Sequence, residues 1–385
     1  MKILLINHEY PPVGGGAATA SANVARYLTK KNNQVEVVTS AFVNLPRIEK
    51  TDGGNVTRIL SGRNTLYAGG VLHFILFIVS GICFFIKEIG KMQPDIVYAF
   101  FTVPAGAIAL FLKKVYKIPY FVFLRGMDVP GIRGSKFDFL NRMLAPLMRY
   151  IWANADRVIA NSQTLKELAS QGDSNSPIHV IPNGVDADFF SPALSEKRNK
   201  TTKILSVGRL SREKGLPCLF DAFTMLVSRM SIPPDLVIVG DGPEKYNLVR
   251  KCARLNIVNQ VTFVGWVNRD TLAQQYREAD LFITTSINEA MPNTLLEAMA
   301  CGLPIIASDI PAHKELIENG TNGILVPVQD AKALAEAIRF LIHDKDLRQR
   351  ISQENLKKVK KYNWDDIGFS FEKMNSEWLQ SKKKQ

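Results

Sequence analysis

Residues 204–215 read ILSVGRLSREKG: a short apolar strand that ends in a glycine-containing turn and leads toward a helix. Further short strands rich in β-branched residues follow, separated by helical stretches, at Leu236 to Val239, Val261 to Val264, Leu281 to Thr284 and Ile305 to Ala307. Strands that alternate with helices form parallel sheets with helices on both faces. The second half of the chain is therefore predicted to be a doubly wound α/β domain.

The first half of the chain has the same rhythm, with a helical period at residues 17–30 and apolar strands at Lys2 to Asn7, Gln34 to Thr39, Ile96 to Phe101 and Tyr120 to Leu124. Residues 191–203, SPALSEKRNKTTK, are polar and lack apolar periodicity, which is typical of a linker. We expect a first doubly wound domain at 1–190, a linker at 191–202, a second at 203–363, and a helical end at 364–385 that crosses back to the first domain. Ligands are expected in a cleft that the carboxyl ends of both sheets face.

The composition of the 385 residues, 46% hydrophobic and 22% charged, suits a globular protein and not a disordered one. An excess of Lys and Arg gives a net charge of +12, which favours nucleic acid, an anionic membrane surface or phosphate-bearing small molecules as partners. Because the basic residues are dispersed and no nucleic-acid reader motif is present, nucleic acid is disfavoured. The four cysteines form no C-x-x-C or Cys/His pattern, which is typical of reduced thiols in a cytoplasmic protein.

One apolar run departs from the pattern of a soluble protein. Residues 66–86 carry no formal charge over 21 positions, and about 20 apolar residues can span a bilayer. The run is interrupted by Gly69, Gly70 and His73, and it leads through Lys87 into a predicted strand. We favour a buried or surface-docked helix over a membrane span, and a helix that dips an apolar face into one leaflet lies between the two.

Two glycine- and cation-containing turns are candidates for binding phosphate. Residues 11–16, PPVGGG, follow the first strand, and glycines at a strand-to-helix turn allow backbone N–H groups to approach an anion, although a tight structural turn explains them equally well. After the strand at 204–207, Arg209 and Lys214 are close enough in sequence to converge on a diphosphate; the alternative is a pair of exposed loop cations. The turns at Gly240 and after Val264 lie where the sheet edge would meet a nucleotide, or are ordinary turns.

The segment 288–302, NEAMPNTLLEAMACG, carries two carboxylates, Glu289 and Glu297. Glu289 follows the strand at 281–284, where a carboxylate is well placed to contact a ligand. For Glu297 a structural explanation competes, because residues 294–297, TLLE, form a capping-box pattern in which Glu297 would bond the backbone of the helix cap.

Taken together, these motifs and the segment IPNGVD at 181–186 resemble glycosyltransferase family 4, the retaining GT-B sugar-nucleotide transferases, over nearly the whole chain. The resemblance implies two Rossmann-like doubly wound domains that face each other across a cleft, with the acceptor on the first and the donor on the second. It also implies that Arg209 and Lys214 hold the donor diphosphate and stabilise the leaving group, while Glu289 binds sugar hydroxyls near the reacting carbon. The implied donor-binding residues are Gly15, Gly16, Gly240, Val264, Met291, Pro292, Asn293, Thr294 and Glu297.

Two positions depart from the family pattern. Arg125, in the segment RGMD at 125–128, stands where a histidine is usual, so a permanent cation replaces an imidazole on the acceptor or sugar side, next to Asp128. This change marks an anionic substrate or a subfamily variant. Ala290 also replaces a common glycine after the first glutamate.

The resemblance implies a retaining, metal-independent hexosyltransferase with no cofactor, using a UDP-, GDP- or ADP-sugar donor and a glycan or lipid-linked acceptor. We expect it to work in cell-surface polysaccharide or lipopolysaccharide synthesis, in the cytoplasm or peripherally on the inner face of the membrane. Two alternatives remain open: a GT-B sugar-nucleotide epimerase, and a non-catalytic, membrane-docked binding protein.

Overall fold

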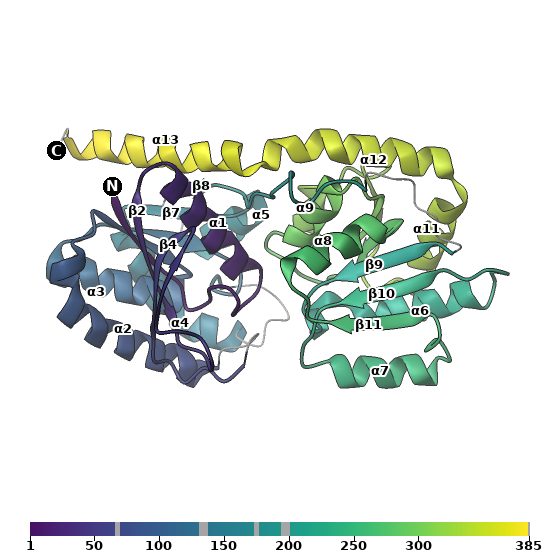
Figure 1. Cartoon of the computed structure of the whole chain (residues 1–385), viewed down its shortest axis with the longest axis horizontal. Coiled ribbons are helices and arrows are strands. Elements are labelled where there is room, and N and C mark those ends of the chain that lie inside the picture. Colours follow the sequence, from purple (N-terminus) through teal and green to yellow (C-terminus); the bar gives the residue numbers. More distant parts are fainter. Residues whose placement is uncertain (66–69, 131–137, 173–176, 194–200, 384–385) are drawn as a thin grey trace. The chain divides into compact units, whose positions relative to one another are not determined.

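The computed structural model describes residues 1–65, 70–130, 138–172, 177–193 and 201–383. The chain divides into two compact units (Figure 1). The first unit comprises residues 1–183 and 364–385, and the second comprises 184–363. Most of the linker expected at 191–202 falls on residues 194–200, outside the described residues.

The described part of the first unit contains an eight-stranded sheet in the order β3-β4-β2-β1-β5-β6-β7-β8. All its neighbouring strands are parallel except β3 and β4, which pair antiparallel. Its strands are β1 (Lys2–Ile6), β2 (Gln34–Ser40), β3 (Ile48–Thr51), β4 (Gly54–Ile59), β5 (Ile96–Phe100), β6 (Tyr120–Leu124), β7 (Arg157–Ala160) and β8 (Ile178–Val180). The central strands β5 and β6 are buried along their whole length, as expected when helices cover both faces.

The helices of the first unit lie on opposite faces of this sheet, and they are α1 (Gly16–Lys30), α2 (Val71–Met92), α3 (Ala107–Tyr116), α4 (Asp138–Asn154), α5 (Gln163–Gly172) and α13 (Trp364–Lys383). Helices α1 and α13 contact each other and share a core with the sheet. Helices α2, α3 and α4 lie side by side on the other face (Figure 1).

The described part of the second unit contains a six-stranded parallel sheet in the order β11-β10-β9-β12-β13-β14. Its strands are β9 (Lys203–Val207), β10 (Asp235–Val239), β11 (Val261–Gly265), β12 (Leu281–Thr284), β13 (Ile305–Ser308) and β14 (Ile324–Val326). Its helices are α6 (Leu216–Val227), α7 (Lys245–Arg254), α8 (Arg269–Glu278), α9 (Asn293–Ala300), α10 (Pro311–Lys314), α11 (Ala331–His343) and α12 (Lys345–Val359). The strands expected from sequence in both halves are confirmed, with ends shifted by one residue at most.

Each sheet has a point where the order of strands reverses. In the first unit β1 lies between β2 and β5, and in the second β9 lies between β10 and β12. The chain passes from β1 to β2 on one side and later adds β5 on the other side, and it places β10 and β12 around β9 in the same way. The loops that follow the two flanking strands therefore separate there. Ligands of doubly wound sheets bind in this crevice at the carboxyl ends of the strands. The turns that carry Gly15 and Arg209 follow β1 and β9 directly.

The apolar run expected to form a helix does so in α2, while its residues 66–69 fall outside the described part. Among the described residues, α2 alone is long and apolar enough to cross a membrane, and one such helix is weak evidence for a span. A stripe of α2 is buried in the first unit, as a docked helix requires, while much of its remaining surface is exposed.

Helix α13 is held to the first unit by aromatic packing. Phe371 is 3% exposed and stacks on Phe123 of β6 with ring centroids 5.7 Å apart. Trp378 meets Phe121 edge to face, and the buried hydroxyl of Tyr98 donates to Asn375 Oδ1 at 2.6 Å. These contacts close one face of the sheet.

We predict that Phe371→Ala lowers the free energy of unfolding of the first unit by about 3–5 kcal/mol, because it leaves a cavity against β6. The matched control is Phe369→Ala on the same helix, which removes a ring that is 62% exposed and should cost little. Calorimetry of the two variants measures both. An equal loss in the control would contradict the packing role of α13.

Candidate functional site

Three turns join at the carboxyl edge of the second sheet. Gly208 N, after β9, donates to Val239 O at 3.0 Å, and Leu210 N donates to Asp241 O at 2.9 Å. The turn after β10 is fastened in the same way to β11, since Gly240 N donates to Gly265 O at 2.8 Å. The turns therefore form one hydrogen-bonded platform beside the point where the strand order reverses.

This close approach explains the glycine at position 240. Its φ is +133°, and a Cβ atom placed there would lie 2.0 Å from the carbonyl oxygen of Gly208. No other residue fits without moving the turn after β9. The predicted donor-binding residue Gly240 thus shapes the turn that precedes Arg209, and Val264 lies one residue before the end of the adjoining β11.

Lys214 and Glu289 meet across the loops that follow β9 and β12. The Lys214 ammonium contacts Glu289 Oε1, and Ser286 Oγ donates to the same oxygen at 2.8 Å. Burial alone would raise the pKa of Glu289, but the charge and hydrogen bond of Lys214, helped by His313 and Ser286, hold it below the ordinary value. Glu289 is therefore an anion at neutral pH, and it is paired with one of the two predicted diphosphate ligands.

Arg209 lies beside Lys214. Both residues line a cavity of about 10 Å³, roughly the space of one water. The Nε atom of Arg209 is buried and has no hydrogen-bond partner among the described residues. A buried donor without a partner is costly, so this side chain is suited to receive an acceptor atom from a ligand.

Glu297 is held by Tyr276, and the capping-box explanation for Glu297 is wrong. Helix α9 begins at Asn293 with Pro292 at the cap and no side-chain cap bond, so Thr294 lies inside the helix. Instead, the buried Tyr276 hydroxyl of α8 donates to Glu297 Oε2 at 2.9 Å. Burial raises the pKa of Glu297 to about 7, partly offset by this hydrogen bond and by the charge of Arg269.

The segment from Met291 to Thr294 leads from the Glu289 loop into α9. Because no side chain caps the helix, its first backbone N–H groups point out of the amino end. The helix dipole makes this end favourable for an anion. The predicted donor-binding run Met291, Pro292, Asn293 and Thr294 thus forms one helix start.

In the first unit, Arg125 follows β6 and is held from two sides. Its Nη1 donates to Asn183 Oδ1 at 2.8 Å, and its guanidinium lies 4.5 Å from the ring centroid of Phe100. Burial lowers the pKa of Arg125 to about 10, and the charge of Asp128 opposes this shift. Arg125 therefore remains a cation at neutral pH, and its buried Nε has no hydrogen-bond partner among the described residues.

Asp128 braces two loops. Its Oδ1 accepts from Arg125 N at 2.9 Å, and its Oδ2 accepts from Thr102 N at 2.6 Å and from Thr102 Oγ1 at 3.0 Å. The preceding residue, Phe101, has φ +77°, a strained conformation for a bulky side chain that costs about 1–3 kcal/mol. Asp128 thus ties the ends of β5 and β6 together and orients the backbone of Arg125.

Gly15 is the cap residue of α1, which begins at Gly16, and no side chain caps this helix. Nothing lies within 4 Å of a Cβ atom placed on Gly15. The start of α1 therefore offers uncrowded backbone next to the carboxyl end of β1, as an anion-binding turn requires.

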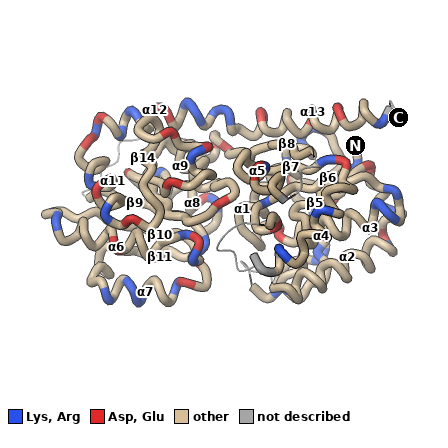
Figure 2. Tube along the Cα trace, turned by 180° about the vertical axis from the view of Figure 1, so that it is seen from behind, with Lys and Arg blue, Asp and Glu red and all other residues tan. Residues whose placement is uncertain are grey.

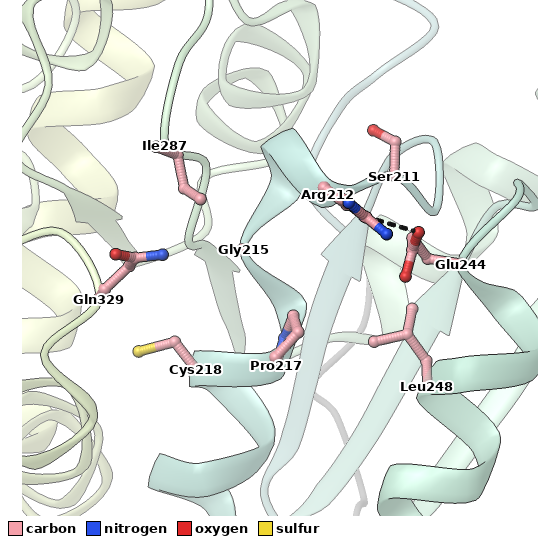
Figure 3. A pocket seen from close by; sticks show the side chains of 9 residues that line it. All are labelled: Ser211, Arg212, Gly215, Pro217, Cys218, Glu244, Leu248, Ile287 and Gln329. Atoms are coloured by element: carbon pink, nitrogen blue, oxygen red, sulfur yellow. Dashed lines mark hydrogen bonds and ion pairs between the residues drawn. The ribbon is translucent and has the colours of Figure 1, made fainter. Parts of the chain in front are cut away.

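A larger cavity of about 250 Å³ lies beside the loop after β9 in the second unit (Figure 3). Ser211, Arg212, Cys218, Glu244 and Gln329 are among the residues that line it, and Arg212 Nε donates to Glu244 Oε1 at 3.2 Å. None of the predicted site residues lines it. The site is better defined by the strand ends than by this cavity.

The structure thus brings Arg209, Lys214 and Glu289 together, while Glu297 is bound separately to α8. Gly15, Gly16, Arg125 and Asp128 lie in the first unit. Sequence reasoning missed Tyr276, which no pattern marks, and Asn183, although the segment at 181–186 pointed to its neighbourhood. Among the described residues, no group of three His, Cys, Asp or Glu side chains is placed to hold a metal ion.

Two family descriptions match consecutive parts of the chain: Glycosyltransferase Family 4 at residues 14–189 and Glycosyl transferases group 1 at 189–358. The two Rossmann-like units and the strand-end site define a GT-B sugar-nucleotide glycosyltransferase. The chain belongs to glycosyltransferase family 4, whose members are retaining enzymes.

Three similar proteins illustrate the range of the family. An uncharacterized glycosyltransferase of Methanocaldococcus jannaschii is 29% identical over 95% of this chain and 96% of its own length. A putative teichuronic acid biosynthesis glycosyltransferase, TuaC, of Bacillus subtilis is 29% identical over 68% of this chain and 65% of its own length. The structure of HepE from Anabaena in complex with UDP-glucose superposes with a TM-score of 0.81 at 21% identity, covering 98% of this chain and all of the other.

The raised pKa of Glu297 predicts how stability depends on pH. Folding favours the protonated carboxyl, so this contribution is complete below the ordinary value of 4.5 and is lost as the pH rises through about 7. The side chain of Glu297→Gln does not titrate. The free energy of unfolding of the variant, relative to that of the wild type, should therefore rise by up to about 3 kcal/mol between pH 4.5 and pH 8.

Denaturant unfolding of the second unit at several pH values measures this difference. The control is Glu336→Gln on α11, whose side chain is 55% exposed and whose replacement should change the free energy of unfolding little. Parallel pH profiles for Glu297→Gln and the wild type would show that this carboxyl is not buried as described.

Proposed function

We propose that this enzyme transfers a hexose, with retention, from a nucleotide-diphosphate sugar to a glycan or lipid-linked acceptor in the synthesis of a cell-surface polysaccharide or lipopolysaccharide. The observation that carries the proposal is the convergence of Arg209, Lys214 and Glu289 where the strand order reverses around β9. Two cations and a carboxylate at that point match a diphosphate and the hydroxyls of the sugar attached to it.

The cations act on the leaving group. When the bond between the sugar and the diphosphate breaks, negative charge grows on the diphosphate oxygens, and fixed cations stabilise that charge without reorganising. Arg209 offers a planar fork whose buried Nε is unsatisfied, while Lys214 offers a point charge. The start of α9 adds backbone N–H groups at Met291 to Thr294.

The pair of Lys214 and Glu289 implies an exchange of partners on donor binding. Lys214 turns part of its hydrogen bonding to the diphosphate, and Glu289 accepts from sugar hydroxyls near the reacting carbon. Ser286 keeps Glu289 Oε1 in place during the exchange. Because the pKa of Glu289 is lowered, the carboxylate remains an acceptor throughout.

Glu297 binds the ribose hydroxyls. Tyr276 fixes its Oε2, and no side-chain hydrogen bond at the helix cap involves Oε1 among the described residues. With a pKa of about 7, Glu297 accepts hydroxyl hydrogen bonds best above neutral pH, when it is ionised. Nucleotide affinity should therefore rise from pH 6 to pH 8.

The first unit takes the acceptor. Arg125, a cation at the carboxyl end of β6 with an unsatisfied Nε, supports an anionic group on the substrate at this position. The uncapped start of α1 at Gly15 and Gly16 is suited to a phosphate of the substrate. Asp128 sets the position of Arg125 through its backbone.

Among UDP-, GDP- and ADP-sugars we place UDP-sugars first, because HepE, which shares the fold, holds UDP-glucose. A surface polysaccharide is supported by the similarity to TuaC, a putative teichuronic acid biosynthesis glycosyltransferase. Thermal stabilisation by each nucleotide sugar tests the donor directly.

Replacing both cations should abolish most donor binding. Arg209→Ala with Lys214→Ala removes two charged hydrogen-bond donors, so the affinity for the nucleoside diphosphate should fall about a hundredfold or more, and turnover should fall with it. The matched control is Arg212→Ala in the same loop, whose side chain is 81% exposed and pairs with Glu244. Titration calorimetry with UDP, GDP and ADP measures all three proteins.

If the double variant bound nucleoside diphosphate as tightly as the wild type, Arg209 and Lys214 would not have the assigned role on the leaving group. Incubation with the donor alone separates the alternatives, because an epimerase changes the sugar without an acceptor. A binding protein without activity would release no nucleotide when an acceptor is present.

A further inference from the structure

Helix α2 has two unlike faces along its 22 residues. One stripe, with residues four positions apart, is buried in the first unit: His73, Phe77, Gly81, Phe85 and Ile89. The opposite stripe is apolar but exposed by between 38% and 68%, and it consists of Leu72, Ile75, Leu76, Val79 and Ile86. A row of exposed apolar side chains along one helix is a candidate interaction surface.

The buried stripe argues against a transmembrane position for α2. Gly81 lies so close to α3 that a Cβ atom there would be 2.6 Å from Ile108 Cδ1, and Phe77 and Phe85 are completely buried. A span would have to give up this packing. The helix therefore stays in the first unit and offers only its outer stripe, as interfacial amphipathic helices do.

Basic residues lie at the end of α2 and on the helices packed beside it. Lys87 and Lys91 lie in the last turns of α2, where Lys91 pairs with Glu88. Exposed Lys114 and Lys117 lie on α3 and directly after it, and exposed Arg149 lies on α4, which packs against α3. Figure 2 shows the Cα trace of α2 without charge over most of its length, with Lys and Arg on the adjacent helices.

We propose that the outer stripe of α2 docks on an anionic lipid bilayer, with the helix lying in the plane of the interface. The apolar side chains enter the boundary of the acyl chains, and the surrounding cations pair with lipid headgroups. A second copy of the chain is a poorer occupant, because it would bring the exposed cations of α2 and α3 close to those of the other copy. This inference rests on the proposed function and deepens it, because the membrane would present the lipid-linked acceptor to the first unit.

Flotation with vesicles tests this surface on the full chain. We expect binding to phosphatidylglycerol-containing vesicles and at least tenfold weaker binding to phosphatidylcholine vesicles, with the difference reduced at high salt. Ile75→Glu with Val79→Asp should lower the affinity for the anionic vesicles at least tenfold. The matched control is Ile232→Glu with Val258→Asp in the second unit, where Ile232 is 66% and Val258 52% exposed, against 52% and 53% for Ile75 and Val79.

The affinity for nucleoside diphosphate, measured without vesicles, should be unchanged in both double variants. This readout separates failure of the docking from failure of the proposed transferase function and reports on folding. Wild-type protein that does not float with anionic vesicles, or an α2 variant that floats like the wild type, would overturn the proposal. So would sedimentation showing a dimer that the α2 variant dissociates.

Cys83 gives a local readout within the stripe. Among the four cysteines it is the exposed one, while Cys218 is partly buried and Cys252 and Cys301 are buried. A polarity-sensitive fluorophore on Cys83 should shift to the blue when anionic vesicles are added, and Cys83→Ser should remove the signal. No shift, or a bound protein that resists extraction by alkaline carbonate as a spanning helix does, would overturn docking in the interfacial plane.

Discussion

The position of β9 between β10 and β12 is the constraint on which the candidate site depends. Parallel strands end at the same edge, so the reversal of order there separates the helices that follow and leaves the strand ends open. The loops after β9 and β12 then meet through Lys214 and Glu289, and the turns after β9, β10 and β11 are joined by backbone bonds. If β9 and β12 were not neighbours in the sheet, the loops that carry the cation and the carboxylate would end apart.

The sequence predicted the strands of this platform because each is a short apolar run bounded by glycine or polar residues, as β12 and the turn at Gly240 show. It also predicted the family and the main charged residues, since these stand at strand ends. It did not predict the partner of Glu297, because the contact with Tyr276 joins two helices 21 positions apart and depends on tertiary packing. The capping-box pattern at Thr294 was misleading because α9 begins at Asn293, with Pro292 as its cap, so that Thr294 is not the cap residue.

The two units use cations in different ways. Lys214 is paired with the carboxylate of Glu289, so a ligand must compete with Glu289 for the Lys214 ammonium. Arg125 rests on an aromatic ring and an amide, and its backbone is fixed by Asp128. Among the described residues no carboxylate pairs with the Arg125 side chain, and such a buried cation favours a negatively charged ligand more strongly than a paired one does.

The return of α13 to the first unit has a consequence for biosynthesis. The sheet face formed by Tyr98, Phe121 and Phe123 is closed by Phe371 and Trp378, which are translated after the entire second unit. During synthesis, the aromatic face of the first sheet therefore stays exposed while some 180 residues of the second unit emerge from the ribosome. A nascent chain of this kind offers a binding surface to chaperones until its final helix is released.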